Sequence, residues 1–74
     1  MKKEVTIGSK IRLKLGGDLK IVQVVGSGDV DIKNGKISYL SPVGESLLGR
    51  KIGERFEIII NENKKIQGQV LAID

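Results

Sequence analysis

Glycine-bounded runs in which charged and apolar residues alternate constrain the fold of this chain more than any other feature of its sequence. The run 10–15 reads Lys-Ile-Arg-Leu-Lys-Leu, and a second run, 19–25, follows Gly16-Gly17-Asp18. A period of two is typical of a strand with one face in a core and the other in water. Because glycine adopts the positive φ of a tight turn without strain, we expect the two runs to pair as a β-hairpin around a three-residue loop.

A third strand is expected after a polar excursion. Gly26-Ser27-Gly28 ends the second strand, and the stretch 28–35 finishes on Asn34-Gly35, a strong turn signal. The chain then returns as a strand over residues 36–40.

The C-terminal part of the chain predicts a second hairpin. Residues 56–60 are apolar and mostly β-branched apart from Glu57, which favours a central strand. The segment 61–63, Asn-Glu-Asn, supplies a turn, and 65–73 alternates again with a bend expected at Gly68. One side of this last strand should carry Ile66, Val70 and Ala72, and the other Gln67, Gln69 and Leu71.

A short helix is predicted between these two halves. Ser41 is a favoured N-cap, since its hydroxyl can accept a hydrogen bond from an unpaired backbone N–H, and Pro42 suits the first helical position. Gly49 is placed to end the helix, with Arg50 and Lys51 beside the negative end of its dipole. The apolar face of this helix of about two turns would comprise Val43, Leu47 and Leu48.

These elements predict an α+β domain, a bent antiparallel sheet of four or five strands with one short helix against it. With 74 residues, the chain is expected to form one domain over residues 1–74. A domain of this size buries only about 60% of the surface that the unfolded chain exposes. It contains no cysteine, so packing alone must stabilise it. No apolar run has the length of a signal peptide or membrane span, which favours a cytoplasmic protein without membrane contact.

Residue types argue against catalysis. The chain has no histidine and no cysteine, which excludes a catalytic triad and an imidazole or thiolate metal site. Asp29 and Asp31 have the spacing that begins a calcium loop, but Asn34 then occupies the required glycine position and Leu40 the required glutamate. The segment 44–51 lacks the lysine and hydroxyl residues of a P-loop in the required register. We therefore expect no enzyme activity, metal, cofactor or small-molecule substrate.

The charge of the chain favours an acidic partner. The formal net charge is +4, and basic residues that could contact phosphates are Lys10, Arg12, Lys14, Lys64 and Lys65. Charged residues on an exposed strand are also simply solvated, and Tyr39 and Phe56 are the only aromatic residues available to stack on bases. A small basic nucleic-acid-binding domain, with weak nucleic-acid contact, is therefore an alternative function.

The segment 31–54 carries a resemblance to a known family. It reads DIKNGKISYLSPVGESLLGRKIGE and resembles, without a gap, the C-terminal domain of bacterial Gre-type transcription elongation factors. In that family a turn of the form D-I-x-N/Q-G-x-I-S is followed by a strand. The motif S-P-x-G/A-x-A/S-L-L-G comes next, and K-x-G-D/E follows it. With flanking matches at 7–11 and 21–26, the resemblance covers about Val5 to Ile73.

The resemblance implies a fold, a partner and a binding site. It implies the FK506-binding-protein-like architecture and binding to bacterial RNA polymerase at the rim of the secondary channel. The family's contacts lie around the turn from strand to helix, which here corresponds to Ser41, Pro42, Val43, Gly44 and Glu45. Because Ser-Pro is also a good N-cap pair, both a structural and a binding role remain open for it.

Departures from the family pattern limit what is expected. Many family members carry Arg or Lys where this chain has Glu45, so the charge beside the implied contact is reversed. The family's N-terminal coiled coil, with its acidic tip, has no counterpart within the 74 residues, so we expect the chain itself not to stimulate transcript cleavage. A natural minimal relative and a fragment of a full-length factor fit the sequence equally. With two aromatic residues, the chain also lacks the ring-lined pocket of a prolyl isomerase.

Overall fold

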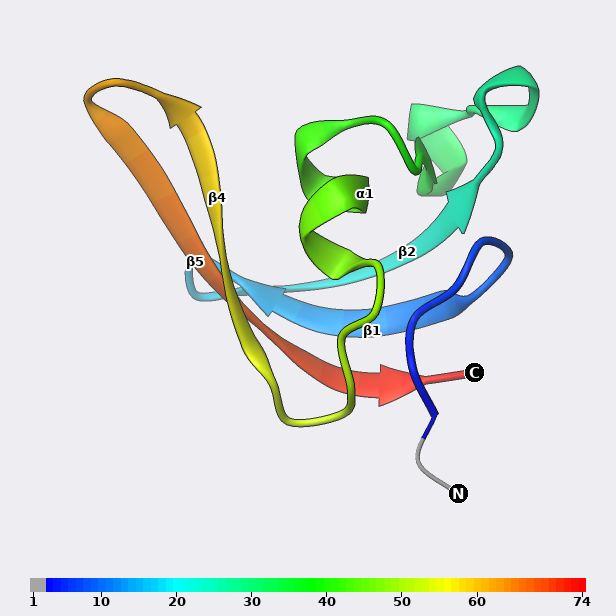
Figure 1. Cartoon of the computed structure of the whole chain (residues 1–74), viewed down its shortest axis with the longest axis horizontal. Coiled ribbons are helices and arrows are strands. Elements are labelled where there is room, and N and C mark those ends of the chain that lie inside the picture. Colours follow the sequence, from blue (N-terminus) through cyan, green and yellow to red (C-terminus); the bar gives the residue numbers. More distant parts are fainter. Residues whose placement is uncertain (1–2) are drawn as a thin grey trace.

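A single curled sheet of five strands, ordered β3-β2-β1-β5-β4, forms the framework of the domain. The computed structural model describes residues 3–74, with every side chain in that range except that of Ile60. The short helix α1 lies in the hollow of the sheet (Figure 1), so the α+β class and the bent sheet with one short helix are confirmed. The strands are β1 (Lys10–Leu15), β2 (Asp18–Val25), β3 (Lys36–Ser38), β4 (Arg55–Asn61) and β5 (Lys64–Ile73); α1 spans Pro42–Leu47, and two 3-10 turns span Ser27–Asp29 and Ile32–Asn34.

The first hairpin forms as predicted, but its loop is one residue shorter than expected. Leu15 pairs with Asp18, which is therefore the first residue of β2, and only Gly16 and Gly17 form the turn. Both glycines have positive φ, at 59° and 98°. Two successive residues of positive φ give the turn whose twist matches that of the flanking strands, and this favours the shorter loop.

The third strand departs from the antiparallel pattern. β3 pairs with β2 in parallel, with Val24 opposite Ile37, and it contains three residues where five were expected. The connection 26–35 turns back through the two 3-10 turns and Gly35, which adopts a left-handed φ of 76°. This excursion brings the chain back beside the end of β2 in the same direction, so the local turn signals were correct but the pairing direction was not.

The prediction that residues 56–60 form a central strand is wrong. β4 is an edge strand, and β1 lies at the centre between β2 and β5. Phe56 and Ile58 are buried under α1, whereas Ile59 is 62% exposed on the opposite face. A short apolar run predicts a strand but not burial of both its faces.

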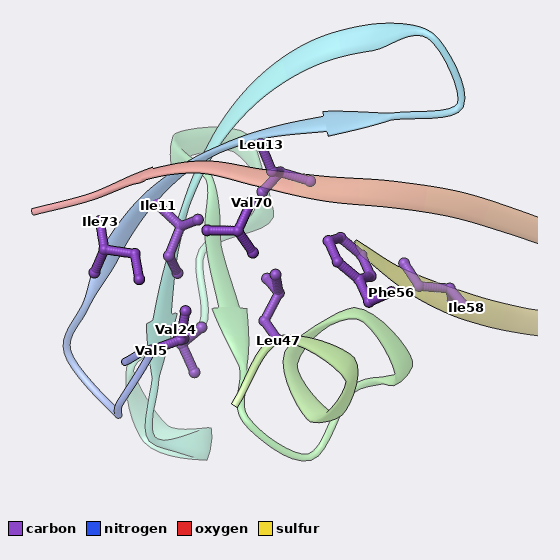
Figure 2. Close-up of a cluster of buried hydrophobic side chains, with 9 residues drawn as sticks. All are labelled: Val5, Ile11, Leu13, Val24, Leu47, Phe56, Ile58, Val70 and Ile73. Atoms are coloured by element: carbon purple, nitrogen blue, oxygen red, sulfur yellow. The ribbon is translucent and has the colours of Figure 1, made fainter. Parts of the chain in front are cut away.

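One core fills the space between α1 and the concave side of the sheet, here called the inner face (Figure 2). β1 supplies Ile11 and Leu13 by simple alternation. The other members are Val5, Val24, Leu47, Phe56, Ile58, Val70 and Ile73. Among residues 3–74, no helix has the length and apolar character needed to cross a membrane.

A β-bulge in β5 changes which residues reach this core. The register of β1 and β5 shifts between Arg12 and Leu13, so that Leu71 is passed over. Val70 is buried as predicted, but beyond the bulge Ile73 enters the core and Ala72 lies opposite Arg12. The extra residue reverses the alternation, which a strict period of two does not anticipate.

The start of α1 packs directly on the backbone of the turn before it. Gly44 is buried, and a Cβ built on it would overlap the carbonyl oxygen of Ser38 and lie 3.0 Å from the Cα of Tyr39. Only glycine allows this approach, because backbone atoms cannot move aside as a flexible side chain can.

We expect Gly44→Ala to lower the free energy of unfolding by about 2 kcal/mol, since the clash outweighs the gain in helix propensity of at most about 1 kcal/mol. Urea denaturation at 25 °C measures the change. Gly28→Ala is the matched control, because a Cβ there meets nothing within 4 Å and the φ is not positive. The control should stay within about 0.5 kcal/mol of the parent protein. Equal stability of the two variants would contradict the packing argument.

Candidate functional site: the start of the helix

The turn that leads into α1 is held by a small hydrogen-bond network around Ser41. Its hydroxyl accepts a hydrogen bond from the backbone N–H of Gly44 at 3.1 Å and donates one to the carbonyl oxygen of Ser38 at 2.7 Å. Its backbone N–H donates to the same carbonyl at 3.0 Å. The predicted N-cap is confirmed, with Pro42 at the start of the helix.

The far end of the helix is fixed as well. Gly49 adopts a φ of 82° just after the cap residue Leu48, as expected of a helix-ending glycine. The Nε of Arg50 donates to the carbonyl oxygen of Ser46 at 2.9 Å, where the helix dipole is negative. With both ends fixed, the six residues of α1 hold a defined geometry despite their small number.

The five residues of the predicted binding site differ sharply in accessibility. Pro42 and Glu45 are exposed, Ser41 and Val43 are half-buried, and Gly44 is buried. Val43 packs against the core, and Ser41 and Gly44 are occupied in shaping the turn. Of the five, only Pro42 and Glu45 therefore present their side chains fully to a partner.

Leu40 is an exposed apolar side chain that the sequence analysis did not assign to the site. It is 59% exposed and immediately precedes the Ser41 cap. The available signal was a leucine outside the helical apolar pattern, placed two residues before a proline at a turn. Leu40, Pro42 and Glu45 together are called the helix-start surface below.

An apolar groove adjoins this surface on the inner side of the first hairpin. It has a volume of about 540 Å³ and reaches Val43 of α1. Ile21 and Ile32 on its margin are 60% and 77% exposed, and Lys20 and Lys33 also line it. Over the described residues its lining is aliphatic and polar, with no aromatic ring of the kind that would hold a proline.

The predicted phosphate-contacting residues fall into two separate groups. Lys10, Arg12 and Lys14 project from β1 on the convex side of the sheet, here called the outer face. Lys64 and Lys65 are the first two residues of β5, just after the turn from β4, and Lys65 lies four residues, or about 13 Å, along β5 from the partner of Lys14. The structure therefore does not bring all five into one cluster.

The acidic turn residues have local structural roles. The carboxylate of Asp31 accepts a hydrogen bond from the side-chain amide of Asn34 at 2.6 Å, and its backbone pairs with that of Lys36. Asp29 ends the first 3-10 turn, with its N–H bonded to the carbonyl of Gly26. Within residues 3–74, no cluster of three acidic, histidine or cysteine side chains could hold a metal ion.

Comparison with known proteins identifies relatives over the whole chain. Residues 1–74 match the family model described as transcription elongation factor, GreA/GreB, C-terminal. Transcription elongation factor GreA of Oenococcus oeni is 39% identical over 74 residues, covering 97% of this chain and 46% of that protein. GreA of Thermodesulfovibrio yellowstonii is 41% identical over 58 residues, covering 74% of this chain and 36% of the relative. The chain thus spans about half of the length of these relatives or less.

Solved structures agree with the sequence match. The crystal structure of GreA factor homolog 1 (Gfh1) of Thermus thermophilus is similar with a TM-score of 0.81 at 28% identity, covering 99% of this chain and 49% of that one. The GreA/GreB factor from Nitrosomonas europaea is similar with a TM-score of 0.75 at 28% identity, over 93% of this chain and 59% of that one. The architecture implied by the sequence resemblance is therefore confirmed.

We expect Ser41→Ala to lower the free energy of unfolding by about 1 kcal/mol, because it removes the helix cap and the bond to Ser38. Thermal or urea unfolding checks this value. Ser27→Ala is the matched control, since Ser27 is exposed and no side-chain bond from it is found among the described residues. A loss as large in the control, or none in Ser41→Ala, would mean that the network is not what holds the turn.

Proposed function

Because this chain belongs to the GreA/GreB family of transcription elongation factors, as a domain matching their C-terminal part, we propose that it binds bacterial RNA polymerase. The proposed place is the rim of the secondary channel, and the proposed contact is the helix-start surface. The observation that supports this choice is the exposure of Leu40 and Pro42 on a turn that is otherwise buried or hydrogen-bonded.

The construction of the turn suits a docking element. Ser41 caps the start of the helix, and Gly44 lets the helix pack on the backbone of residues 38–39. Arg50 donates a hydrogen bond to a carbonyl oxygen at the helix end. A surface that is rigid before binding loses little conformational entropy when a partner attaches. Contacts from Leu40 and Pro42 therefore contribute to affinity without an ordering cost for the backbone.

The groove beside Val43 extends the docking surface. Its aliphatic lining fits an apolar side chain of the partner, while Lys20 and Lys33 attract nearby carboxylates. An anchor in a pocket next to a small exposed apolar turn is the usual arrangement of a site in which few residues supply most of the binding energy.

Binding, and not cleavage, is the activity proposed for the 74-residue polypeptide. Its only α-helix among residues 3–74 has six residues, about 9 Å of axial length, and no described acidic cluster could carry a metal ion. Such a polypeptide occupies the docking position and excludes competitors without reaching the catalytic centre of the polymerase. Its place of action is the cytoplasm, where bacterial transcription occurs.

We expect fluorescently labelled 74-residue protein to bind bacterial core RNA polymerase and to be displaced by an unlabelled full-length Gre factor. The double variant Leu40→Ser, Pro42→Ala should bind about tenfold more weakly, because it removes the two exposed apolar groups of the turn. Fluorescence anisotropy titration measures both affinities.

Ile52→Ser is the matched control for this titration. Ile52 is 56% exposed and lies in the turn beyond the other end of α1, so its loss should leave affinity unchanged. All variants are checked by urea unfolding before use. The proposed docking would be refuted if the folded protein did not bind at micromolar polymerase. It would also be refuted if the full-length Gre factor did not displace the bound protein.

We expect Glu45→Arg to strengthen the same binding by about threefold to tenfold, since it restores the charge common at this position in the family. Glu62→Arg, an equal charge change at the exposed β4–β5 turn, serves as control. The gain should shrink as salt rises, because exposed charges are screened. Equal effects of the two substitutions would attribute the gain to net charge and not to a local contact.

A further inference from the structure

The positive charge of this protein is concentrated on the outer face of its sheet. Strand pairing places alternate residues of neighbouring strands side by side on that face, such as Lys14 with Gln69 and Gln69 with Arg55. Within the strands, the charged side chains of the outer face are Lys10, Arg12, Lys14, Lys36, Glu57, Arg55 and Lys65. These six cations and one carboxylate carry +5, so the rest of the chain, with seven cations and eight carboxylates, carries −1 of the total of +4.

Most of these cations are not neutralised within the protein. Glu57 pairs with Lys65, with their charged atoms 3.9 Å apart, and this is the only salt bridge among residues 3–74. Asp74, whose N–H bonds to the carbonyl of Lys10, adds a negative charge near one end of β1. Arg12 and Lys14, in the middle of the face, are exposed and have no such neighbour.

Two apolar side chains lie directly beside these central cations. Leu19 is paired with Lys14, and Ile21 with Arg12, on the adjacent strand β2. They are 73% and 60% exposed. A shallow hollow of about 310 Å³ is lined by Arg12, Leu19, Lys20 and Ile21. We call the four residues Arg12, Lys14, Leu19 and Ile21 the outer-face patch.

The patch combines cations with aliphatic side chains, and this combination distinguishes an acidic protein segment from a nucleic acid as its partner. Phosphates of a nucleic acid would use Arg12 and Lys14 but would leave Leu19 and Ile21 in water, and stacking of bases requires aromatic rings. The two aromatic residues are unsuited to this, since Phe56 is buried and Tyr39 packs against the core. Aliphatic side chains next to cations instead match a protein segment that carries both carboxylates and apolar residues.

We propose that the outer-face patch is a second docking surface, which binds an acidic, amphipathic segment of a partner protein. The carboxylates of the segment face Arg12 and Lys14, and its apolar side chains cover Leu19 and Ile21. α1 packs on the inner face, so Arg12, Lys14 and Leu19 stay open when the helix-start surface is engaged (Figure 1). Ile21 also reaches the margin of the groove beside Val43. The inference does not depend on the proposed polymerase contact and assigns the chain a second site on the face of the sheet away from α1.

A titration of the full chain with synthetic probes tests the proposal. The first probe is a labelled helical peptide of about 18 residues, with leucines on one face and glutamates on the other. The second has serines in place of the leucines, and the third is a DNA duplex of about 20 base pairs. We expect the first probe to bind about tenfold more tightly than the other two at about 150 mM salt.

Paired variants locate the binding on the protein. Arg12→Glu, Lys14→Glu and, separately, Leu19→Ser, Ile21→Ser should each weaken binding of the leucine-containing peptide by about fivefold or more. The matched control Lys51→Glu, Lys64→Glu changes net charge equally at exposed positions outside both this face and the groove beside Val43, and it should alter binding less than about twofold.

Several outcomes would overturn the proposal. DNA binding as tight as the peptide would make the face a nucleic-acid surface, and equal binding of the serine peptide would make it a purely electrostatic one. A loss in the Lys51 and Lys64 control equal to that in the Arg12 and Lys14 variant would place the peptide elsewhere. Sedimentation tests for self-association. If the apparent molecular mass of the protein rose with its concentration, and this rise were lost in the Leu19 and Ile21 variant, the patch would bind a second copy of the chain.

Discussion

The close contact between the start of α1 and the backbone of residues 38–39 is the constraint on which the rest of this domain depends. Gly44 has no side chain there because the carbonyl of Ser38 occupies the space. This contact lets a six-residue helix, too short to be stable alone, place Leu47 at the centre of the core. The same contact brings the Ser38 carbonyl within reach of the Ser41 hydroxyl, so packing and capping support each other.

Curvature of the sheet is the second requirement, since a flat sheet could not enclose a core of this size. Gly68 lies opposite Phe56 in the neighbouring strand, and a side chain there would overlap the aromatic ring. The ring of Phe56 therefore packs over the backbone of β5 at Gly68, where no side chain is in the way. The bulge at Leu71 adds a residue on the same strand, which increases local bending and turns Ile73 into the core. Figure 1 shows β5 as one long, curved strand that runs from the β4–β5 turn to the C-terminus.

Features decided by neighbouring residues could be predicted from the sequence, and features decided by distant ones could not. The cap at Ser41, the stop at Gly49 and the hairpin around Gly16-Gly17-Asp18 depend on a few residues of known preference, and each was found, although Asp18 belongs to β2 and not to the loop. The parallel pairing of β3 and the edge position of β4 depend on where whole segments meet, which periodicity does not encode.

The candidate site shows the same division. The resemblance located the turn, but it could not separate residues that build the turn from residues free to contact a partner. Accessibility makes that separation: Ser41 and Gly44 are committed to the fold, while Pro42 and Glu45 are free. Leu40 was missed because a leucine that follows Tyr39 resembles an ordinary strand residue until the early end of β3 is known. Arg55 was missed as a neighbour of Lys14, since the two are linked only through β5.

A small domain of this kind has two faces that cannot both be buried. The helix α1 covers the inner face, and the hydrophobic core of the described residues lies between the two. The outer face must stay soluble, and lysine and arginine also discourage association through the sheet. The need for solubility, however, does not explain why Leu19 and Ile21 lie in the middle of those charges. Polar residues at these two positions would keep the face soluble with less tendency to aggregate. Exposed aliphatic side chains kept beside unpaired cations are better explained by a partner that covers both, and this separates the outer face from an ordinary solvated surface.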